Sequence, residues 1–184
     1  MYPTQYENIP KSKFMKSDLE GVACIIFTTP ELENVDPREF ADLYTPHVRK
    51  HAESSDDYIF IVAEDLPLGF SDSHKYNLPK LEHVYKIDEF LRKNHDKKIL
   101  AVCDAGISRS GFVSFMLDMK NHNYDKISVM ADYDGAWMFN RSRRVVTEGN
   151  IYLANSAYCG FLRESQILTI AEEIEYDKMI KRGE

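Results

Sequence analysis

A cysteine and an arginine separated by five residues are the side chains of this sequence best suited to chemistry. The segment from Lys97 to Gly111, KKILAVCDAGISRSG, holds Cys103, then Arg109, then Ser110 directly after it. A cysteine thiolate is a strong nucleophile, and an arginine guanidinium binds two oxygens of one phosphate at a time. The spacing therefore predicts a nucleophile beside an oxyanion site in one short loop.

The residues around this loop predict a strand before it and a helix after it. Residues 99–102 are apolar without alternation, which is typical of a strand buried on both faces. Apolar residues at 112–119 recur every three or four positions and indicate a helix with one buried face. Backbone N–H groups at a helix N-terminus favour an anion, and Gly106 permits the angles that turn them inward. We therefore expect these amides to bind phosphate and the same field to stabilise the Cys103 thiolate.

The segment CDAGISRS resembles the Cys-x5-Arg-Ser/Thr signature of the cysteine-dependent protein tyrosine phosphatase superfamily, and is most similar to its dual-specificity branch. The resemblance implies that Cys103 accepts the phosphate, that Arg109 stabilises the transition state, and that Ser110 assists loss of the thiolate. One position differs: the family usually has a histidine before the cysteine, where it helps to tune the thiolate, and this chain has Val102. The phosphate cradle implied by the resemblance consists of Asp104, Ala105, Gly106, Ile107, Ser108 and Arg109.

Hydrolysis through a cysteine also needs a carboxylate, which protonates the leaving oxygen and later deprotonates a water. In the resembled family this carboxylate lies on a separate loop before the cysteine. Asp65 is the preferred candidate because it follows the apolar run at residues 58–63, a predicted strand that we expect beside the strand at 99–102. Asp72 is the alternative, because it lies in a Gly- and Ser-containing loop at a spacing closer to that of small dual-specificity phosphatases. His74 is a third candidate.

The length and composition fit one domain. The chain has 184 residues, of which 43% are hydrophobic and 29% charged. Residues 1–20 are polar and contain prolines, and we expect them to form an irregular N-terminal arm before a phosphatase-like domain at 21–184. Apolar runs at 22–28, 58–63 and 99–102 predict strands that alternate with helices. The predicted fold class is α/β, with a central, mostly parallel sheet flanked by helices, as in the resembled family.

The other helices are predicted from apolar spacing. Asn77 is expected to cap a helix that ends near Asn94. Apolar residues from Ile127 to Met138 suggest a further helix interrupted at Gly135, with Trp137 as a core anchor. Residues 150–162 and 165–179 are predicted to form two closing helices.

Charge and cysteine content restrict the partners and the compartment. The net charge of −7 argues against a nucleic-acid or acidic-membrane binder. No stretch approaches the ~20 apolar residues of a membrane span, and the N-terminus lacks the apolar segment of a signal peptide, so we expect a cytoplasmic protein. Cys24, Cys103 and Cys159 lack metal-ligand spacing and fit a reducing compartment. Cys24 is interpreted as a core residue; the alternative is a reversible disulfide with Cys103, as in some phosphatases of the resembled superfamily.

The expected activity is hydrolysis of phosphate monoesters through a cysteinyl-phosphate intermediate, without metal or cofactor. The resemblance implies a phosphorylated protein substrate, with phosphotyrosine or dual specificity. The variable loop positions include no lysine, which argues against a phosphoinositide substrate. A small phosphorylated molecule and an RNA 5′-phosphate are alternative substrates. Two rivals remain: a catalytically weak phosphate-binding pseudophosphatase, supported by Val102, and a sulfur-transfer or arsenate-reducing enzyme, which needs a resolving thiol near the loop.

Overall fold

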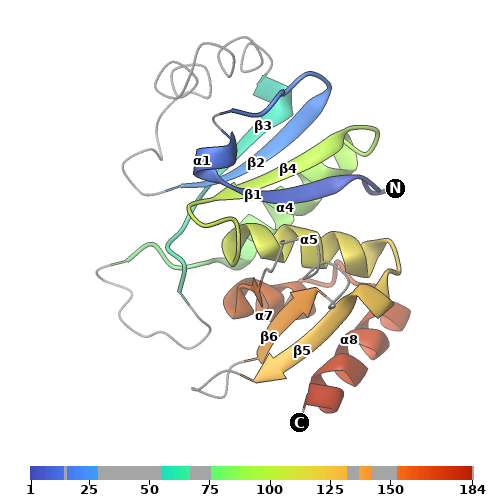
Figure 1. The fold of residues 1–184 in the computed structure, drawn as a ribbon. Coiled ribbons are helices and arrows are strands. Elements are labelled where there is room, and N and C mark those ends of the chain that lie inside the picture. The colour runs from blue at the N-terminus through green and yellow to red at the C-terminus, as the bar shows by residue number, and fades with distance from the viewer. Residues whose placement is uncertain (15, 29–54, 67–75, 132–136, 142–152, 184) are drawn as a thin grey trace.

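The main sheet consists of four parallel strands with helices packed on it (Figure 1). The computed structural model describes residues 1–14, 16–28, 55–66, 76–131, 137–141 and 153–183. The strands follow the order β1-β4-β2-β3 across the sheet. Their bounds are β1 Tyr6–Pro10, β2 Val22–Thr28, β3 Tyr58–Val62 and β4 Lys98–Cys103. The α/β class and the parallel sheet were predicted from the sequence, and both are confirmed.

Strand β4 lies between two neighbours, which explains its unbroken apolar sequence. Ile99 is opposite Tyr6 of β1 on one side and Ala23 of β2 on the other. Alternate residues of β4 belong to two different core clusters, because successive side chains of a strand point to opposite faces. Cys103 is the last residue of β4 and lies at the carboxyl end of the strand.

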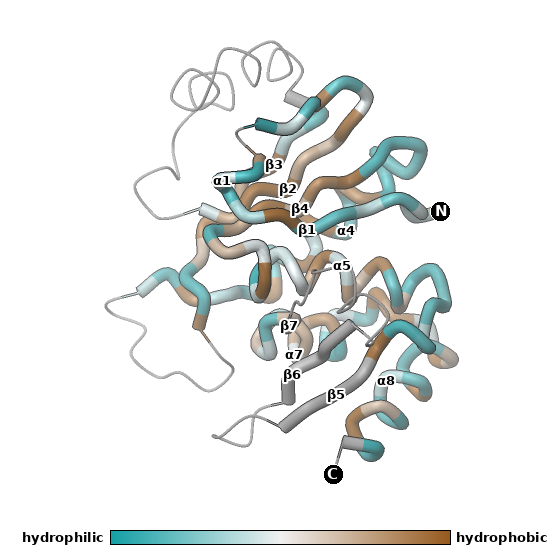
Figure 2. The backbone as a smooth tube through the Cα atoms, in the orientation of Figure 1, coloured by the Kyte–Doolittle hydropathy of each residue, from teal (hydrophilic) through white to brown (hydrophobic). Residues whose placement is uncertain are grey.

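Helices cover one face of the sheet in two layers (Figure 1). Helices α4 (Leu81–Lys93) and α5 (Arg109–Lys120) pack against the strands, and α7 (Ser156–Glu164) and α8 (Ile170–Gly183) contact α4 or α5. Side chains from all four helices and the sheet form the larger core cluster. Figure 2 shows the corresponding pattern, with hydrophobic residues along β2 and β4 and hydrophilic ones recurring on α4 and α8.

Helix α5 differs from its prediction because it has no solvent-facing side over most of its length. Every residue from Arg109 to Met119 is buried, polar ones included. The sheet lies on one side of the helix, and a second, smaller sheet contacts the other. A helix covered on several sides is apolar around much of its circumference. The sequence pattern predicts only one buried face for this helix.

The N-terminal segment is ordered, contrary to the expected irregular arm. Residues 6–10 form β1, which pairs along its whole length with β4. Residues Lys11–Phe14 form the short helix α1. Phe14 and Leu19 are buried and close the smaller core cluster on the second face of the sheet. A polar segment with few apolar residues can form this strand because it pairs with β4 through the backbone along its whole length.

The second sheet replaces the helix predicted between Ile127 and Met138. Strands β5 (Ile127–Ala131), β6 (Trp137–Arg141) and β7 (Leu153–Ala154) pair in antiparallel order. Short apolar runs fit helical and extended periods equally well, and here the antiparallel pairing of β6 with β5 and β7 decides between them. The Trp137 side chain lies outside the described part of the structure.

Helix starts depart from the predicted positions by several residues. Helix α4 begins after Lys80 rather than after Asn77, and it ends at Lys93 with Asn94 as its C-cap, near the expected end. Helix α7 begins at Ser156 after the cap residue Asn155. Two 3-10 turns, η2 (Ser55–Asp57) and η3 (Tyr124–Lys126), precede β3 and β5. None of the helices in the described ranges is long and apolar enough to cross a bilayer.

Candidate active site

Cys103 lies where β4 gives way to the loop that leads into α5. The residue is 2% exposed. Its Sγ atom is 3.1 Å from the Ser110 Oγ atom, in the first turn of α5. The hydroxyl can therefore donate a hydrogen bond to a thiolate at Cys103, which is the contact that the role implied for Ser110 by the resemblance needs.

The loop between Cys103 and Arg109 turns sharply at Gly106. This glycine has φ +69°, and an added Cβ would lie 2.4 Å from the Pro10 backbone nitrogen and 2.5 Å from the Ile9 carbonyl carbon. Only glycine fits, both for its backbone angle and because β1 passes directly behind the loop. The Asn8 side chain also donates to the Gly106 carbonyl at 3.2 Å, and accepts a hydrogen bond from Ser114 of α5. Strand β1 is therefore a support of the loop.

Arg109 is the first residue of α5, and its side chain turns toward the loop and the end of β3. It is 4% exposed. Its Nη1 donates to the Ala63 carbonyl at 2.8 Å, and its Nη2 donates to Asp104 Oδ2 at 2.5 Å. Its Nε is buried and has no hydrogen-bond partner among the described residues. A buried N–H of this kind is costly to leave unpaired, so the guanidinium is suited to bind an anionic ligand, to which this N–H would donate.

Asp65 contacts the loop, although not by the predicted route. Strand β3 pairs with β2 and not with β4, so Asp65 approaches from two strands away. The connection is made by Ser108, whose hydroxyl donates to Asp65 Oδ1 at 2.6 Å. The side chain of Asp65 is exposed. The alternative candidates Asp72 and His74 lie outside the described residues.

Asn155 is a residue of this site that the sequence did not indicate. Its side-chain amide donates to Asp65 Oδ1 at 2.9 Å and to the Leu66 carbonyl at 3.1 Å. Its backbone N–H donates to the Ser108 carbonyl at 3.1 Å. A signal was present, because asparagine before an apolar helix is a common N-cap, but nothing in the sequence linked that cap to Cys103.

Two aromatic residues, Tyr158 and Phe112, stack on each other close to Arg109. The Tyr158 ring stacks on Phe112 of α5, with centroids 5.2 Å apart. Its hydroxyl lies 3.1 Å from His83 Nδ1 on α4. Burial raises the pKa of Tyr158, and the nearby Arg109 charge opposes that shift. Tyr158 is therefore a neutral packing residue behind the site.

The other two cysteines are core residues. Cys24 belongs to the smaller core cluster and Cys103 to the larger one, so they face opposite sides of the sheet. All three thiols are free, and this placement opposes the alternative of a Cys24–Cys103 disulfide. Burial raises the pKa of both Cys24 and Cys159, which keeps these thiols protonated and unreactive.

Within the described ranges, no group of three His, Cys, Asp or Glu side chains is arranged to hold a metal ion. The site thus consists of a thiol, a hydroxyl, a guanidinium, loop amides and a carboxylate, drawn from β4, α5 and the end of β3. No protein-family model, curated protein or solved structure matches the chain.

Proposed function

We propose that this chain is a metal-independent cysteine phosphatase that hydrolyses phosphate monoesters. The observation that carries the proposal is the junction of β4 and α5, where Cys103, Ser110 and Arg109 meet at one helix N-terminus. The position of β4 inside a parallel sheet supports a protein tyrosine phosphatase-like fold, since ligands of such sheets bind beyond the carboxyl ends of strands. The proposed domain includes β1, because that strand belongs to the sheet.

The first step is attack on phosphorus by the Cys103 thiolate. An S–P bond forms and the ester P–O bond breaks, while Arg109 and the amides of residues 104–109 hold the equatorial oxygens. Asp65 donates its proton to the leaving oxygen. Its hydrogen bond to Ser108 supports this role, because it holds the carboxyl beside the phosphate loop.

The second step returns the enzyme to its starting state. Asp65 takes a proton from a water, the water oxygen attacks phosphorus, and the S–P bond breaks to release inorganic phosphate. The Ser110 hydroxyl, 3.1 Å from Sγ, donates a hydrogen bond to the departing sulfur. Charge neutralisation by Arg109 and the amides supports a mechanism without a metal.

The proposed substrate is a phosphorylated protein, with phosphotyrosine or dual specificity, as the resemblance of the loop implies. A small phosphorylated molecule is the alternative substrate. We also propose that the protein acts in the cytoplasm, since a reactive thiolate needs a reducing compartment.

A second candidate function is a phosphate-binding module with little turnover. Two observations favour it: Val102 stands where the resembled family usually has histidine, and the Cys103 side chain is almost fully buried. A module of this kind would bind phosphate through the cradle and Arg109 without chemistry at Cys103.

Hydrolysis of para-nitrophenyl phosphate in metal-free buffer across pH separates these functions. Cys103→Ser is expected to abolish turnover, while Cys24→Ala, which removes a thiol on the opposite face of the sheet, retains it. Asp65→Asn is expected to lower turnover by about 10²–10⁴, and Asp72→Asn to change it little.

The outcomes assign the roles. A loss with Asp72→Asn in place of Asp65→Asn would transfer the acid role to Asp72. Turnover that survives Cys103→Ser would refute the cysteine mechanism. A wild-type protein that binds inorganic phosphate without turnover would favour the binding module.

A further inference from the structure

Arg109 binds a carboxylate of its own loop. Its Nη2 donates to Asp104 Oδ2 at 2.5 Å. The two side chains differ in freedom, because that of Arg109 is 5% exposed and that of Asp104 is 64% exposed. The arginine is also fixed by the Ala63 carbonyl. Asp104 is therefore the partner that can rotate away.

The contact occupies half of the edge with which an arginine binds phosphate. A guanidinium binds two oxygens of one anion best through two parallel N–H groups, and Nε and Nη2 form such an edge. In Arg109, Asp104 takes Nη2, whereas Nε is buried without a partner among the described residues. The carboxylate thus engages the edge through one oxygen and leaves the other N–H unsatisfied.

We propose that Asp104 is a specificity-determining residue that competes with phosphate for the Nε–Nη2 edge of Arg109, an inference that rests on the proposed function. A phosphate that bridges both N–H groups displaces the carboxylate, since two anions on one edge repel each other. Phosphate can do so because it also satisfies the buried Nε.

The contact between Asp104 and Arg109 weakens anion binding and stabilises the guanidinium when no ligand is bound. Affinity for every anion is lowered, because each must replace an existing ion pair. In the absence of ligand, the same pair keeps the buried guanidinium partly neutralised and oriented, which limits the cost of an unpaired buried charge. Anions that engage the edge through one atom gain less against Asp104 than anions that engage it through two oxygens, so the loop favours phosphate over monatomic anions such as chloride.

Isothermal titration with inorganic phosphate at fixed pH and ionic strength tests this role. Asp104→Asn keeps the side-chain shape and removes the charge, and we expect its dissociation constant for phosphate to fall about tenfold, the change that corresponds to ~1.4 kcal/mol. Asp96→Asn is the matched control. Asp96 is an exposed carboxylate that precedes β4, at the opposite end of the strand from Cys103, and its removal should change the constant less than twofold.

A second pair of variants separates competition at the arginine edge from a general effect of charge. In an Arg109→Lys background the planar edge is absent, so the gain from Asp104→Asn should shrink to less than about threefold. A gain of the same size in both backgrounds would refute competition at the edge. Thermal midpoints of all variants, measured without phosphate, show whether each one folds.

The outcomes distinguish this inference from the function on which it rests. If wild type binds phosphate and Asp104→Asn binds it equally or more weakly, Asp104 is no competitor and the phosphatase proposal stands. If neither wild type nor Asp104→Asn binds phosphate, and wild type shows no turnover, the proposed function itself fails.

Discussion

Asn155 uses nearly all of its hydrogen-bonding capacity to join two loops and a helix. Its amide nitrogen donates to Asp65 and to the Leu66 carbonyl. Its amide oxygen accepts from the backbone N–H groups of Ala157 and Tyr158 at the start of α7, at 3.1 and 3.3 Å. An asparagine can do both because it carries donors and an acceptor on one planar group. Asn155 is therefore a positioning residue for the candidate acid.

Asn155→Asp separates the two tasks of this side chain. The carboxylate still caps α7 and is favoured at a helix N-terminus, so stability should change little. It cannot donate to Asp65 and repels it, so we expect turnover to fall by about tenfold to a hundredfold. The loss should be larger with phenyl phosphate than with para-nitrophenyl phosphate, because the poorer leaving group depends more on the acid.

The comparison of the two substrates makes this prediction specific. A variant that had only distorted the fold would lose both activities in the same proportion, and its thermal midpoint would fall. Equal losses on the two substrates would show that Asn155 does not act through Asp65.

Helices α4 and α7 are joined behind the site by a histidine whose charge state matters for stability. Two donors approach His83 Nδ1: the Lys80 backbone N–H at 3.3 Å and the Tyr158 hydroxyl at 3.1 Å. An imidazolium would carry a proton on this atom, so it would lose the bond from the Lys80 N–H, and the Tyr158 hydroxyl would have to accept instead of donate. Burial, together with the positive charges of Lys80 and Lys86, lowers the pKa of His83 to about 4.

This pKa predicts an acid-sensitive contact between α4 and α7. The ordinary value is 6.5 and the folded value about 4, so below pH 6.5 the unfolded chain binds a proton that the folded chain does not. The stabilisation is present above pH 6.5 and is lost as pH falls toward 4. A shift of this size corresponds to ~3 kcal/mol for a fully buried group; because His83 is partly exposed, we expect about 1–2 kcal/mol.

Urea unfolding at several pH values measures this contribution. Between pH 6.5 and 4 the free energy of unfolding should fall more steeply for wild type than for His83→Asn, whose side chain keeps an acceptor near the Nδ1 position and does not titrate there. His95→Asn, which removes an exposed histidine after α4, should leave the steep slope in place. Parallel slopes for wild type and His83→Asn would contradict the prediction.

Elements whose structure follows from their own residues were predictable, and elements that exist only through pairing or contact with another segment were not. The order of β4, loop and α5 follows from one apolar run, one glycine and one apolar-spaced helix, so the placement of Cys103, Arg109 and Ser110 at one junction was predictable from the sequence. Strand β1 exists because β4 lies beside it. Strands β5 and β6 exist because they pair with each other. The contact of Asp65 with Ser108 depends on how residues 43 positions apart meet, which no local pattern encodes.

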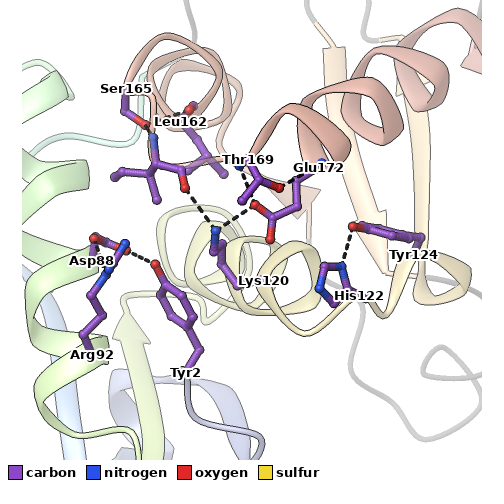
Figure 3. A network of polar contacts seen from close by, with 11 residues as sticks. Tyr2, Asp88, Arg92, Lys120, His122, Tyr124, Leu162, Ser165, Thr169 and Glu172 are labelled. Atoms are coloured by element: carbon purple, nitrogen blue, oxygen red, sulfur yellow. Dashed lines mark hydrogen bonds and ion pairs between the residues drawn. The ribbon is translucent and has the colours of Figure 1, made fainter.

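On the scale of the whole molecule, a polar network ties the N-terminus to three helices (Figure 3). The Tyr2 hydroxyl donates to Asp88 of α4, and the Tyr2 ring lies 5.3 Å from the Arg92 guanidinium and 5.2 Å from Lys120 Nζ. Lys120, the last residue of α5, pairs with Glu172 of α8 at 2.7 Å. Both side chains are nearly inaccessible, with 7% and 3% exposure.

The buried pair connects the end of the site helix α5 to the start of α8. Lys120 Nζ also donates to the Ile167 carbonyl at 3.0 Å, and Glu172 Oε2 accepts from the Thr169 backbone N–H at 2.7 Å, which caps α8. Burial alone would raise the pKa of Glu172, but hydrogen bonds from Lys120 and Thr169 outweigh it and lower this pKa. Glu172 therefore stays ionised in the folded protein.

Because a buried charge without a partner is costly, Lys120→Met should destabilise the protein more than the loss of one hydrogen bond. We expect the free energy of unfolding at pH 7 to fall by about 3 kcal/mol. Adding Glu172→Gln to this variant should recover part of the loss, since no uncompensated carboxylate remains. Equal stabilities of the single and double variants would contradict this account.

The difference in free energy of unfolding between wild type and Lys120→Met should narrow as pH falls below 4.5, the ordinary carboxyl pKa. Below that pH the unfolded chain binds a proton at Glu172 before folded wild type does, because the pKa of Glu172 is lowered in the folded protein, and wild type therefore loses stability. Urea titrations at pH 7 and pH 4 measure the difference.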